Sequence, residues 1–204
     1  MADQAQDFTE HPVSSTVRYK GRMLEVREDE VRLPDGNPAR REYIVHPGAA
    51  VILPLFDDWS VLLERQFRYP LHRHCFELPA GKLEPGEPAL LTAQRELKEE
   101  TGYDAAEWSH LCTTHPCVGY SDEAVQIFLA RGLTFTARAL DEGEFLETLV
   151  VPLDEALEWV MRGVITDVKV RVTRAPEMET FRVFFVPSWK AGMELVRETV
   201  QRRL

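Results

Sequence analysis

The chain has 204 residues, of which 44% are hydrophobic, a proportion that is ordinary for a globular protein. It carries 34 acidic and 24 basic residues, giving a formal net charge of −10, which argues against a nucleic acid partner. We expect no membrane contact and a cytoplasmic location, because the sequence has no long apolar run and starts without a basic and apolar signal segment. The three cysteines form no CxxC pair, which favours free thiols over disulfides or a zinc site.

Within the first 46 residues, residues 15–36 and 40–46 alternate between apolar and polar side chains, a pattern that is typical of strands with one exposed face. The turn-forming sequence Pro34-Asp35-Gly36 interrupts this alternation. We expect two or three antiparallel strands, which form a sheet too small to be stable alone. Residues 1–46 are therefore interpreted as an N-terminal β-sheet that packs on the rest of the chain or on a partner, and residues 47–204 as the main domain.

From residue 47 onward, apolar runs and helical periodicity follow one another irregularly along the chain. The predicted strands are Val51–Phe56, Trp59–Phe67, Cys75–Gly81, Ala124–Leu133, Phe145–Leu153 and Phe181–Pro187. The predicted helices are Pro88–Thr101, Leu153–Val164 and Ser188–Leu204. Because strands and helices mix without regular alternation, the pattern predicts an α+β fold in which helices pack on a mixed β-sheet.

The segment between residues 88 and 101 has the clearest helical signals. Proline is favoured at the first helical position, occupied by Pro88, and glycine just after the end, occupied by Gly102. The side of this helix that is predicted to face the core carries Leu90, Ala93 and Leu97. The neighbouring side carries Glu96, Glu99 and Glu100.

Three glutamates at the end of one helix are electrostatically unfavourable. They repel one another, and the helix dipole disfavours negative charge in the last turn. One interpretation is a solvated acidic face that pairs with Arg95 and Lys98. The other is a binding site for a hard divalent cation such as Mg²⁺ or Mn²⁺. The preceding loop, Glu77–Glu87, favours the cation, since its two glycines and two prolines can bring backbone groups close to a ligand.

The segment from Gly81 to Tyr103 resembles the Nudix box, G-x5-E-x7-R-E-U-x-E-E-x-G-U, in which U is a bulky apolar residue. The matching residues are Gly81, Glu87, Arg95, Glu96, Leu97, Glu99, Glu100 and Gly102, with Tyr103 at the last U position. The resemblance implies a Nudix fold, in which a mixed sheet lies between helices and the box forms a loop, a helix and a loop. It also implies Mg²⁺-dependent hydrolysis of a nucleoside diphosphate linked to another moiety.

Three stretches beside and within the box resemble one branch of this family, the ADP-ribose and nucleoside-diphosphate-sugar pyrophosphatases. They are Leu62–Pro70, Phe76–Glu87 and Gly119–Ala130. The resemblance implies cleavage of the pyrophosphate bond of ADP-ribose to AMP and ribose 5-phosphate. It also implies a homodimer whose subunits exchange the N-terminal sheet, which would give residues 1–46 the packing partner that they need.

One position differs from the usual pattern of the ADP-ribose group. Val118 stands where a proline is usual, and the nearby Pro116 is displaced by two residues. Another nucleoside diphosphate sugar, such as GDP-mannose, is therefore the alternative substrate. A ligand sensor that has the fold but no catalysis is the rival from another class, and the intact box argues against it.

The resemblance also implies a set of metal ligands. Glu96 and Glu100 correspond to the main ligands, and the backbone carbonyl of Ala80 corresponds to a further one. Glu99 lies close enough to share the metal or to act through a water molecule.

Two residues outside the box correspond to substrate-binding residues of the family. Arg68 corresponds to an arginine that holds substrate phosphate, a task that suits its planar guanidinium, with an internal ion pair as the alternative. Glu123 corresponds to a residue that contacts the ribose across the dimer, with a surface salt bridge as the alternative.

The catalytic base of this group lies on a later acidic loop, which corresponds to residues 140–147. Glu142 is our choice for the base that activates water, and Glu144 for a metal ligand, although the two roles could be exchanged. If neither acts, Glu99 is the next candidate for the base. An exposed hairpin loop without a catalytic role is the alternative for the whole segment.

Overall fold

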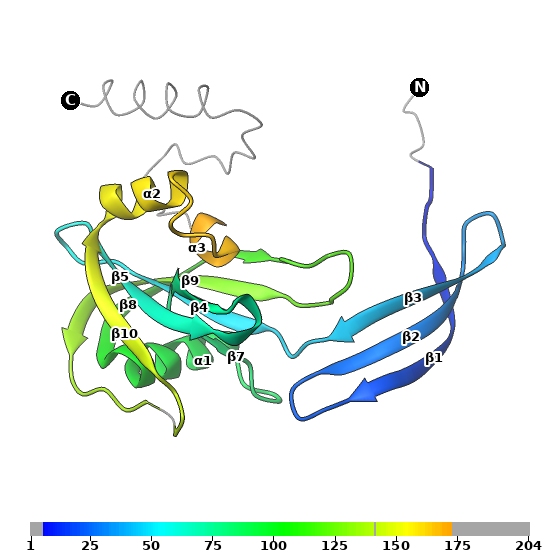
Figure 1. The fold of residues 1–204 in the computed structure, drawn as a ribbon, viewed down its shortest axis with the longest axis horizontal. Helices are drawn as coiled ribbons and strands as arrows, with labels where there is room; N and C mark the ends of the chain where they lie inside the picture. Colours follow the sequence, from blue (N-terminus) through cyan, green and yellow to red (C-terminus); the bar gives the residue numbers. More distant parts are fainter. Residues whose placement is uncertain (1–5, 141, 173–204) are drawn as a thin grey trace.

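The structure, a computed structural model, describes residues 6–140 and 142–172, without the side chains of residues 171 and 172. An antiparallel sheet of order β1-β2-β3 forms the N-terminal part (Figure 1). Its strands are β1 (His11–Lys20), β2 (Glu25–Arg32) and β3 (Pro38–Val45). The predicted turn at residues 34–36 connects β2 to β3 and is closed by hydrogen bonds between Leu33 and the residues Gly36 and Asn37.

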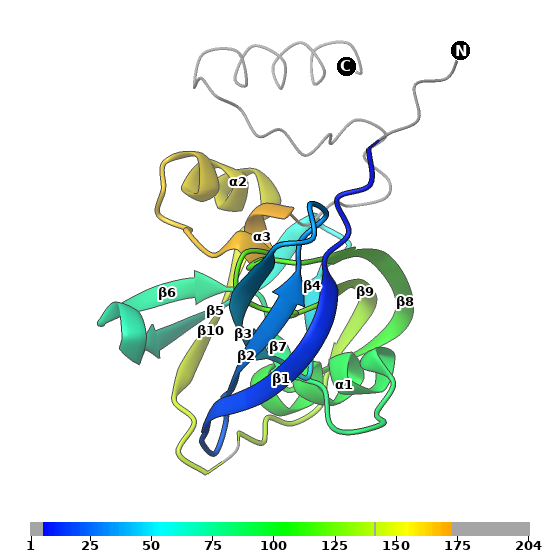
Figure 2. The ribbon, with the colours of Figure 1, turned by 90° about the vertical axis from the view of Figure 1, so that its right-hand side faces the viewer.

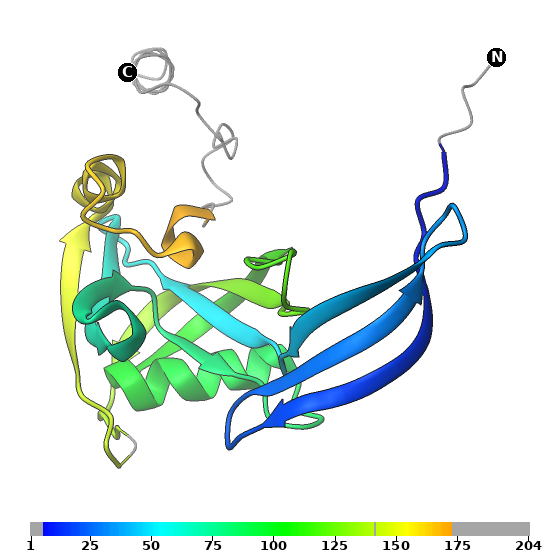
Figure 3. The same ribbon diagram turned by 45° about the vertical axis from the view of Figure 1, so that its right-hand side comes forward.

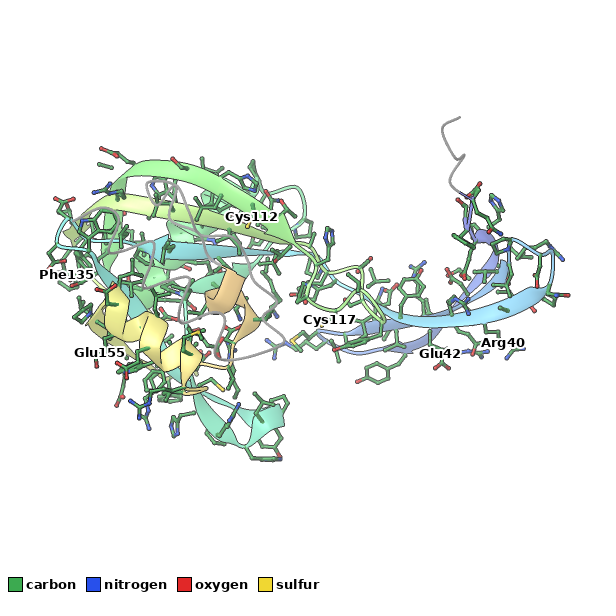
Figure 4. All side chains as sticks on the ribbon, turned by 90° about the horizontal axis from the view of Figure 1, so that it is seen from above. Arg40, Glu42, Cys112, Cys117, Phe135 and Glu155 are labelled. Carbon is green, nitrogen blue, oxygen red and sulfur yellow. The ribbon has the colours of Figure 1, made fainter. Side chains whose placement is uncertain are left out.

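The N-terminal sheet projects from the main body (Figures 1 and 3). All ten residues of β1 are exposed, among them Val13, Val17 and Tyr19. The end of β3 is attached to a loop of the main body, since the Ile44 N–H donates a 2.8 Å hydrogen bond to the Tyr120 carbonyl. Figure 4 shows Cys117 of this loop between the main body and the N-terminal sheet. The sheet therefore finds little cover within its own chain, and of the two predicted packing surfaces, the rest of the chain supplies only a small one.

Two further sheets form the main body. A mixed sheet of order β7-β4-β9-β8 pairs β4 in parallel with β9 and the other neighbours antiparallel. Its strands are β4 (Ala49–Pro54), β7 (Ala80–Lys82), β8 (Tyr103–Thr114) and β9 (Val125–Phe135). An antiparallel sheet of order β10-β5-β6 contains β5 (Ser60–Arg68), β6 (Arg73–Glu77) and β10 (Leu146–Pro152). A short 3₁₀ helix, η1 (Tyr69–Leu71), joins β5 to β6.

Helices cover the mixed sheet on opposite sides (Figure 2). On one face, α1 (Ala89–Glu96) packs its buried side chains against Ile52 of β4 and Phe128 of β9. On the other face, α2 (Leu153–Met161) and the β10-β5-β6 sheet enclose a core around Leu53, Leu63 and Ile127. A last short helix, α3 (Val168–Val172), follows α2. This arrangement confirms the predicted α+β fold with a mixed sheet between helices.

The predicted helix over residues 88–101 is confirmed, but its buried side differs from the prediction. Leu90 is 38% exposed, because the helix begins at Ala89 and turns Ala89, Ala93 and Leu97, spaced four residues apart, towards the sheet. After Glu96 the backbone continues as a π-helix, η2 (Leu97–Thr101), and ends at Gly102 in the left-handed conformation.

Strand β8 was not predicted, because it lies at an edge of the mixed sheet and all of its residues are exposed or half-buried. The predicted strand at residues 181–187 and the predicted helix at residues 188–204 lie outside the described residues. The three cysteines are free, as expected. Among the described helices, none has the length and apolar character that a membrane span requires.

Candidate functional site

The end of the box helix lies directly against strand β7. An added Cβ atom at Gly81 would lie 1.8 Å from Oε1 of Glu96, so a larger residue here would displace the Glu96 carboxylate from its position beside β7. At the other end of the box, Gly102 has a φ of +80°, and its carbonyl accepts a 2.7 Å hydrogen bond from the Thr136 N–H. The glycines that begin and end the box thus bring β7 and the segment after β9 to the same end of the helix.

Arg95 holds three of the box glutamates together. Its Nη1 atom lies 2.9 Å from Oε1 of Glu96 and 2.9 Å from Oε2 of Glu99. Its Nη2 atom lies 3.4 Å from Oε2 of Glu87, which also accepts a 2.7 Å hydrogen bond from the Thr92 hydroxyl. Arg95 therefore orients carboxylates in this structure, in the way a planar guanidinium with several donors can.

Glu100 lies deeper than the other box glutamates. Only 6% of its surface is exposed, and its Oε2 atom accepts a 3.0 Å hydrogen bond from the Ala80 N–H, which places Ala80 beside this carboxylate. Burial, followed by the charges of Glu64 and Glu96, raises the pKa of Glu100 from 4.5 to about 10. Burial also raises the pKa of Glu96, with Glu99 and Glu144 adding to it against the opposing charge of Arg95.

Glu64, on β5, is a second buried carboxylate in this cluster, with 4% of its surface exposed. Burial, followed by the charge of Glu144, raises the pKa of Glu64 to about 8. The sequence interpretation missed Glu64. A usable signal existed, because it follows the apolar residues Val61–Leu63 in a strand that was predicted correctly, and charged side chains are rarely buried without a partner.

The segment that leads into the acidic loop is attached to the box and to the end of the loop. The Ala139 N–H donates a 3.2 Å hydrogen bond to the Glu99 carbonyl, and Arg138 donates one of 2.8 Å to the Leu146 carbonyl. Glu144 is half-buried, and its charge acts on Glu64, Glu96 and Glu100. Glu142 is exposed, near the tip of the loop. The structure thus brings Glu144, rather than Glu142, to the carboxylate cluster.

Arg68 forms a two-point ion pair with Glu77 of the neighbouring strand. Its Nε atom lies 2.6 Å from Oε1 of Glu77 and its Nη2 atom 2.7 Å from Oε2. Lys169 of α3 adds a 3.1 Å contact to the same carboxylate and also pairs with Asp167. Although burial opposes it, these hydrogen bonds from Arg68 and Lys169 lower the pKa of Glu77 to about 2. Both Glu77 and Lys169 were absent from the set that the sequence suggested.

The structure places Glu123 away from this ion pair, at the junction with the N-terminal sheet. Its Oε1 atom lies 3.8 Å from Nδ1 of His46, and the His46 N–H donates a 2.7 Å hydrogen bond to the neighbouring Asp122. Val118, in the same loop, is 83% exposed. Glu123 therefore contacts His46, the residue that follows β3. Among the described residues, no interaction connects Glu123 to the carboxylate cluster.

The chemistry of these donors fits a hard divalent cation. Four carboxylates, from Glu64, Glu96, Glu100 and Glu144, act on one another, and two of them are buried without a cation of their own. Among the described residues, however, no three acidic, histidine or cysteine side chains already surround a single point. Cation binding therefore requires side-chain adjustment, and Arg95, which holds Glu96 and Glu99, is the partner they would have to share.

The raised pKa values of Glu64 and Glu100 predict how the stability of the metal-free protein depends on pH. Their folded-state pKa values lie above the ordinary value of 4.5, so their stabilising contribution is complete below about pH 4.5 and is lost as pH rises through about 8 to 10. In EDTA, we expect the free energy of unfolding to fall between about pH 5 and pH 8, by up to about 1.4 kcal/mol per pH unit for each carboxyl, and the melting temperature to fall with it.

Glu100→Gln should flatten this dependence and raise the melting temperature at the higher pH. Glu147→Gln is the matched control, because Glu147 is an exposed glutamate with a surface partner, Arg65. Thermal unfolding followed by circular dichroism measures all three proteins. If the melting temperatures of the wild type and Glu100→Gln depend on pH in the same way, the burial of the Glu100 carboxyl is not the cause of this dependence.

The sequence matches two family descriptions, the NUDIX domain over residues 45–170 and the nucleoside diphosphate sugar hydrolase N-terminal domain over residues 10–44. It is 38% identical to "ADP-ribose pyrophosphatase" of Bacillus subtilis, covering 80% of this chain and 90% of that protein. It is 36% identical to "Methanol dehydrogenase activator" of Bacillus methanolicus, covering 79% and 89% of the two chains. A protein of Mycobacterium tuberculosis, "ADP-ribose pyrophosphatase", is 37% identical over 76% of each chain.

The fold is also similar to a solved structure, that of an "ADP compounds hydrolase". The two chains superpose with a TM-score of 0.69 over 98% of each, although only 21% of the residues are identical. The matched family description, over residues 45–170, spans more than half of the chain. The chain therefore belongs to the Nudix hydrolase family.

Proposed function

We propose that this protein hydrolyses the pyrophosphate bond of ADP-ribose or a related nucleoside diphosphate sugar, giving a nucleoside monophosphate and a sugar phosphate. The observation that carries the proposal is a buried carboxylate cluster whose charge also acts on Arg68, a cation with 43% of its side chain exposed. Cation-binding oxygens and a phosphate-binding guanidinium at one site suit a pyrophosphate substrate. Two of the relatives described above are named ADP-ribose pyrophosphatase.

Mg²⁺ is the proposed cofactor, with Mn²⁺ able to replace it, and the ligands are Glu96, Glu99, Glu100, Glu144 and the carbonyl of Ala80. When bound, the cation neutralises the charge of the pyrophosphate and makes nearby water more acidic. The residues of the chain hold this site together. The Nη1 atom of Arg95 binds the carboxylates of both Glu96 and Glu99. The Ala80 N–H donates to the carboxylate of Glu100 and holds it in place.

Arg68 is the proposed phosphate-binding residue. A guanidinium has five N–H donors, and the ion pair with Glu77 uses the Nε and Nη2 atoms of Arg68. That pair fixes the plane of the guanidinium and leaves its Nη1 side outside the pair. The internal ion pair and the phosphate contact, considered as alternatives for this residue, are therefore compatible with each other.

Glu142 is the proposed base, because carboxylates that hold a cation are poor proton acceptors. Its exposed position near the tip of the loop means that it must approach the substrate by a movement of that loop. Glu144 already acts on the cluster and suits a ligand role. If the loop residues exchange roles, Glu144 is the base, and Glu99 is the next candidate.

We also propose a cytoplasmic homodimer in which the N-terminal sheet, residues 1–46, packs on the partner subunit. The exposed apolar residues of β1 support this assembly, because a sheet of three strands with so little cover needs a packing surface. Glu123 lies where this sheet joins the main body, which suits a contact to the ribose of a substrate bound across the dimer.

A panel of nucleotides tests the proposed reaction. With Mg²⁺, we expect ADP-ribose to release AMP, GDP-mannose and other nucleoside diphosphate sugars to react more slowly, and EDTA to stop all turnover. Released nucleoside monophosphate, separated by chromatography, is the measurement. If GDP-mannose reacts faster than ADP-ribose, the proposed substrate is wrong but the proposed hydrolysis of the pyrophosphate bond is retained. Binding of ADP-ribose without turnover of any compound would identify a ligand sensor instead.

The two glutamates of the acidic loop can be separated by a Mg²⁺ titration. Glu142→Gln should lower kcat by about 10²–10⁴-fold with little change in KM, the usual share of general-base catalysis. Glu144→Gln should instead weaken the apparent Mg²⁺ affinity, so that additional Mg²⁺ restores turnover. The opposite pattern shows that the roles are exchanged, and full activity in both variants places the base elsewhere.

The dimer can be tested on the exposed face of β1. Val17→Glu, combined with Tyr19→Ser, should convert the dimer into a monomer, because both side chains are exposed within the single chain and charge at the proposed interface is unfavourable. Val164→Glu is the matched control, since Val164 is similarly exposed but follows α2 in the main body. Light scattering after size-exclusion chromatography measures the mass. Dimers of unchanged stability in the double variant would exclude β1 from the interface.

A further inference from the structure

Glu64 is the one carboxylate of the cluster that the box resemblance leaves without a role. Its Oε1 atom is fully buried and has no hydrogen-bond partner. A buried carboxylate without a partner is costly, and such groups in folded proteins usually bind a cation, a proton donor or water. Glu64 is therefore expected to have a partner in the working protein.

Glu64 interacts electrostatically with the other carboxylates of the cluster. Glu64 of β5 pairs with Glu77 of β6, whose charge is balanced by Arg68 and Lys169. For Glu64 itself, the strongest charge in the surroundings is that of Glu144, and Glu64 in turn is the strongest charge acting on Glu100. The unpartnered carboxylate thus lies within the field of other carboxylates, and the charges of Arg138 and Arg68 only partly offset it.

We propose that Glu64 is a further ligand of the divalent cation, contributed from strand β5 on the buried side of the site. This inference rests on the cation site of the proposed function and adds a ligand that lies outside the box and the acidic loop. One cation between Glu64 and Glu100 would satisfy two buried carboxylates at once, which is the arrangement that oxygen-rich sites for hard cations use.

The assignment gives β5 a second task. Glu64 and Arg68 are four residues apart on one strand, so their side chains project from the same face, with roughly 13 Å between their Cα atoms. A cation ligand and the phosphate-binding arginine would then be held at a fixed separation by one rigid element. The competing explanation is a proton that Glu64 shares with Glu100, without contact to a cation.

Mn²⁺ binding to the full chain, without nucleotide, distinguishes these explanations. Free Mn²⁺ is measured by electron paramagnetic resonance, so the readout does not depend on turnover. We expect Glu64→Gln to weaken Mn²⁺ binding at least 10-fold or to remove one bound ion. Glu147→Gln, the exposed glutamate on β10, should bind Mn²⁺ as the wild type does. Wild-type affinity and stoichiometry in Glu64→Gln would overturn the inference and support the shared proton.

Circular dichroism in EDTA checks that Glu64→Gln is folded. If it is not, Glu64→Asp provides the same test, because it retains the charge but withdraws it by one methylene group. A ligand shortened in this way should bind Mn²⁺ more weakly, and unchanged binding would overturn the inference.

Turnover of ADP-ribose is assayed separately on the wild type. A wild type that binds Mn²⁺ through Glu64 but hydrolyses no nucleoside diphosphate sugar would disprove the proposed function and leave the ligand assignment intact. If the wild type is active and Glu64→Gln binds Mn²⁺ as the wild type does, the proposed function stands and the ligand assignment of Glu64 is wrong.

Discussion

Repulsion between carboxylates, two buried and two half-buried, is the interaction on which the rest of this site depends. Glu64, Glu96, Glu100 and Glu144 meet where β5, the end of the box helix and the acidic loop come together. The protein holds them with a backbone N–H, a shared arginine and a glycine contact, none of which provides each carboxylate with its own countercharge. Folding therefore stores an unfavourable electrostatic energy that cation binding can relieve.

The second group of buried charges shows the opposite arrangement within the same sheet. Glu77 lies opposite Glu64, but it is enclosed by the guanidinium of Arg68 and the ammonium of Lys169, and its pKa is low instead of high. Two glutamates at paired positions thus differ in their role because of what surrounds them. Glu77 holds the guanidinium of Arg68 in place, and Glu64 has no countercharge of its own among the described residues.

The sequence predicted the parts of this site that depend on local spacing. Glu96, Glu99 and Glu100 lie within one helical turn, so their proximity follows from helix geometry alone, and Gly102 ends the helix as expected. Glu64 and Glu77 could not be placed in this way, because their neighbourhood depends on the register between β5 and β6 and on how that sheet packs. Leu90 was misplaced because the buried side of a short helix is set by the sheet beneath it.

The close contact between Gly81 and Glu96 limits which residues can replace either of them. Glycine is required at position 81 only while the Glu96 side chain occupies the space that a Cβ atom would need. A smaller residue at position 96 would leave room for a Cβ atom at position 81. A side chain at position 81 is therefore compatible with this packing only when position 96 carries a smaller residue, so the two positions constrain each other.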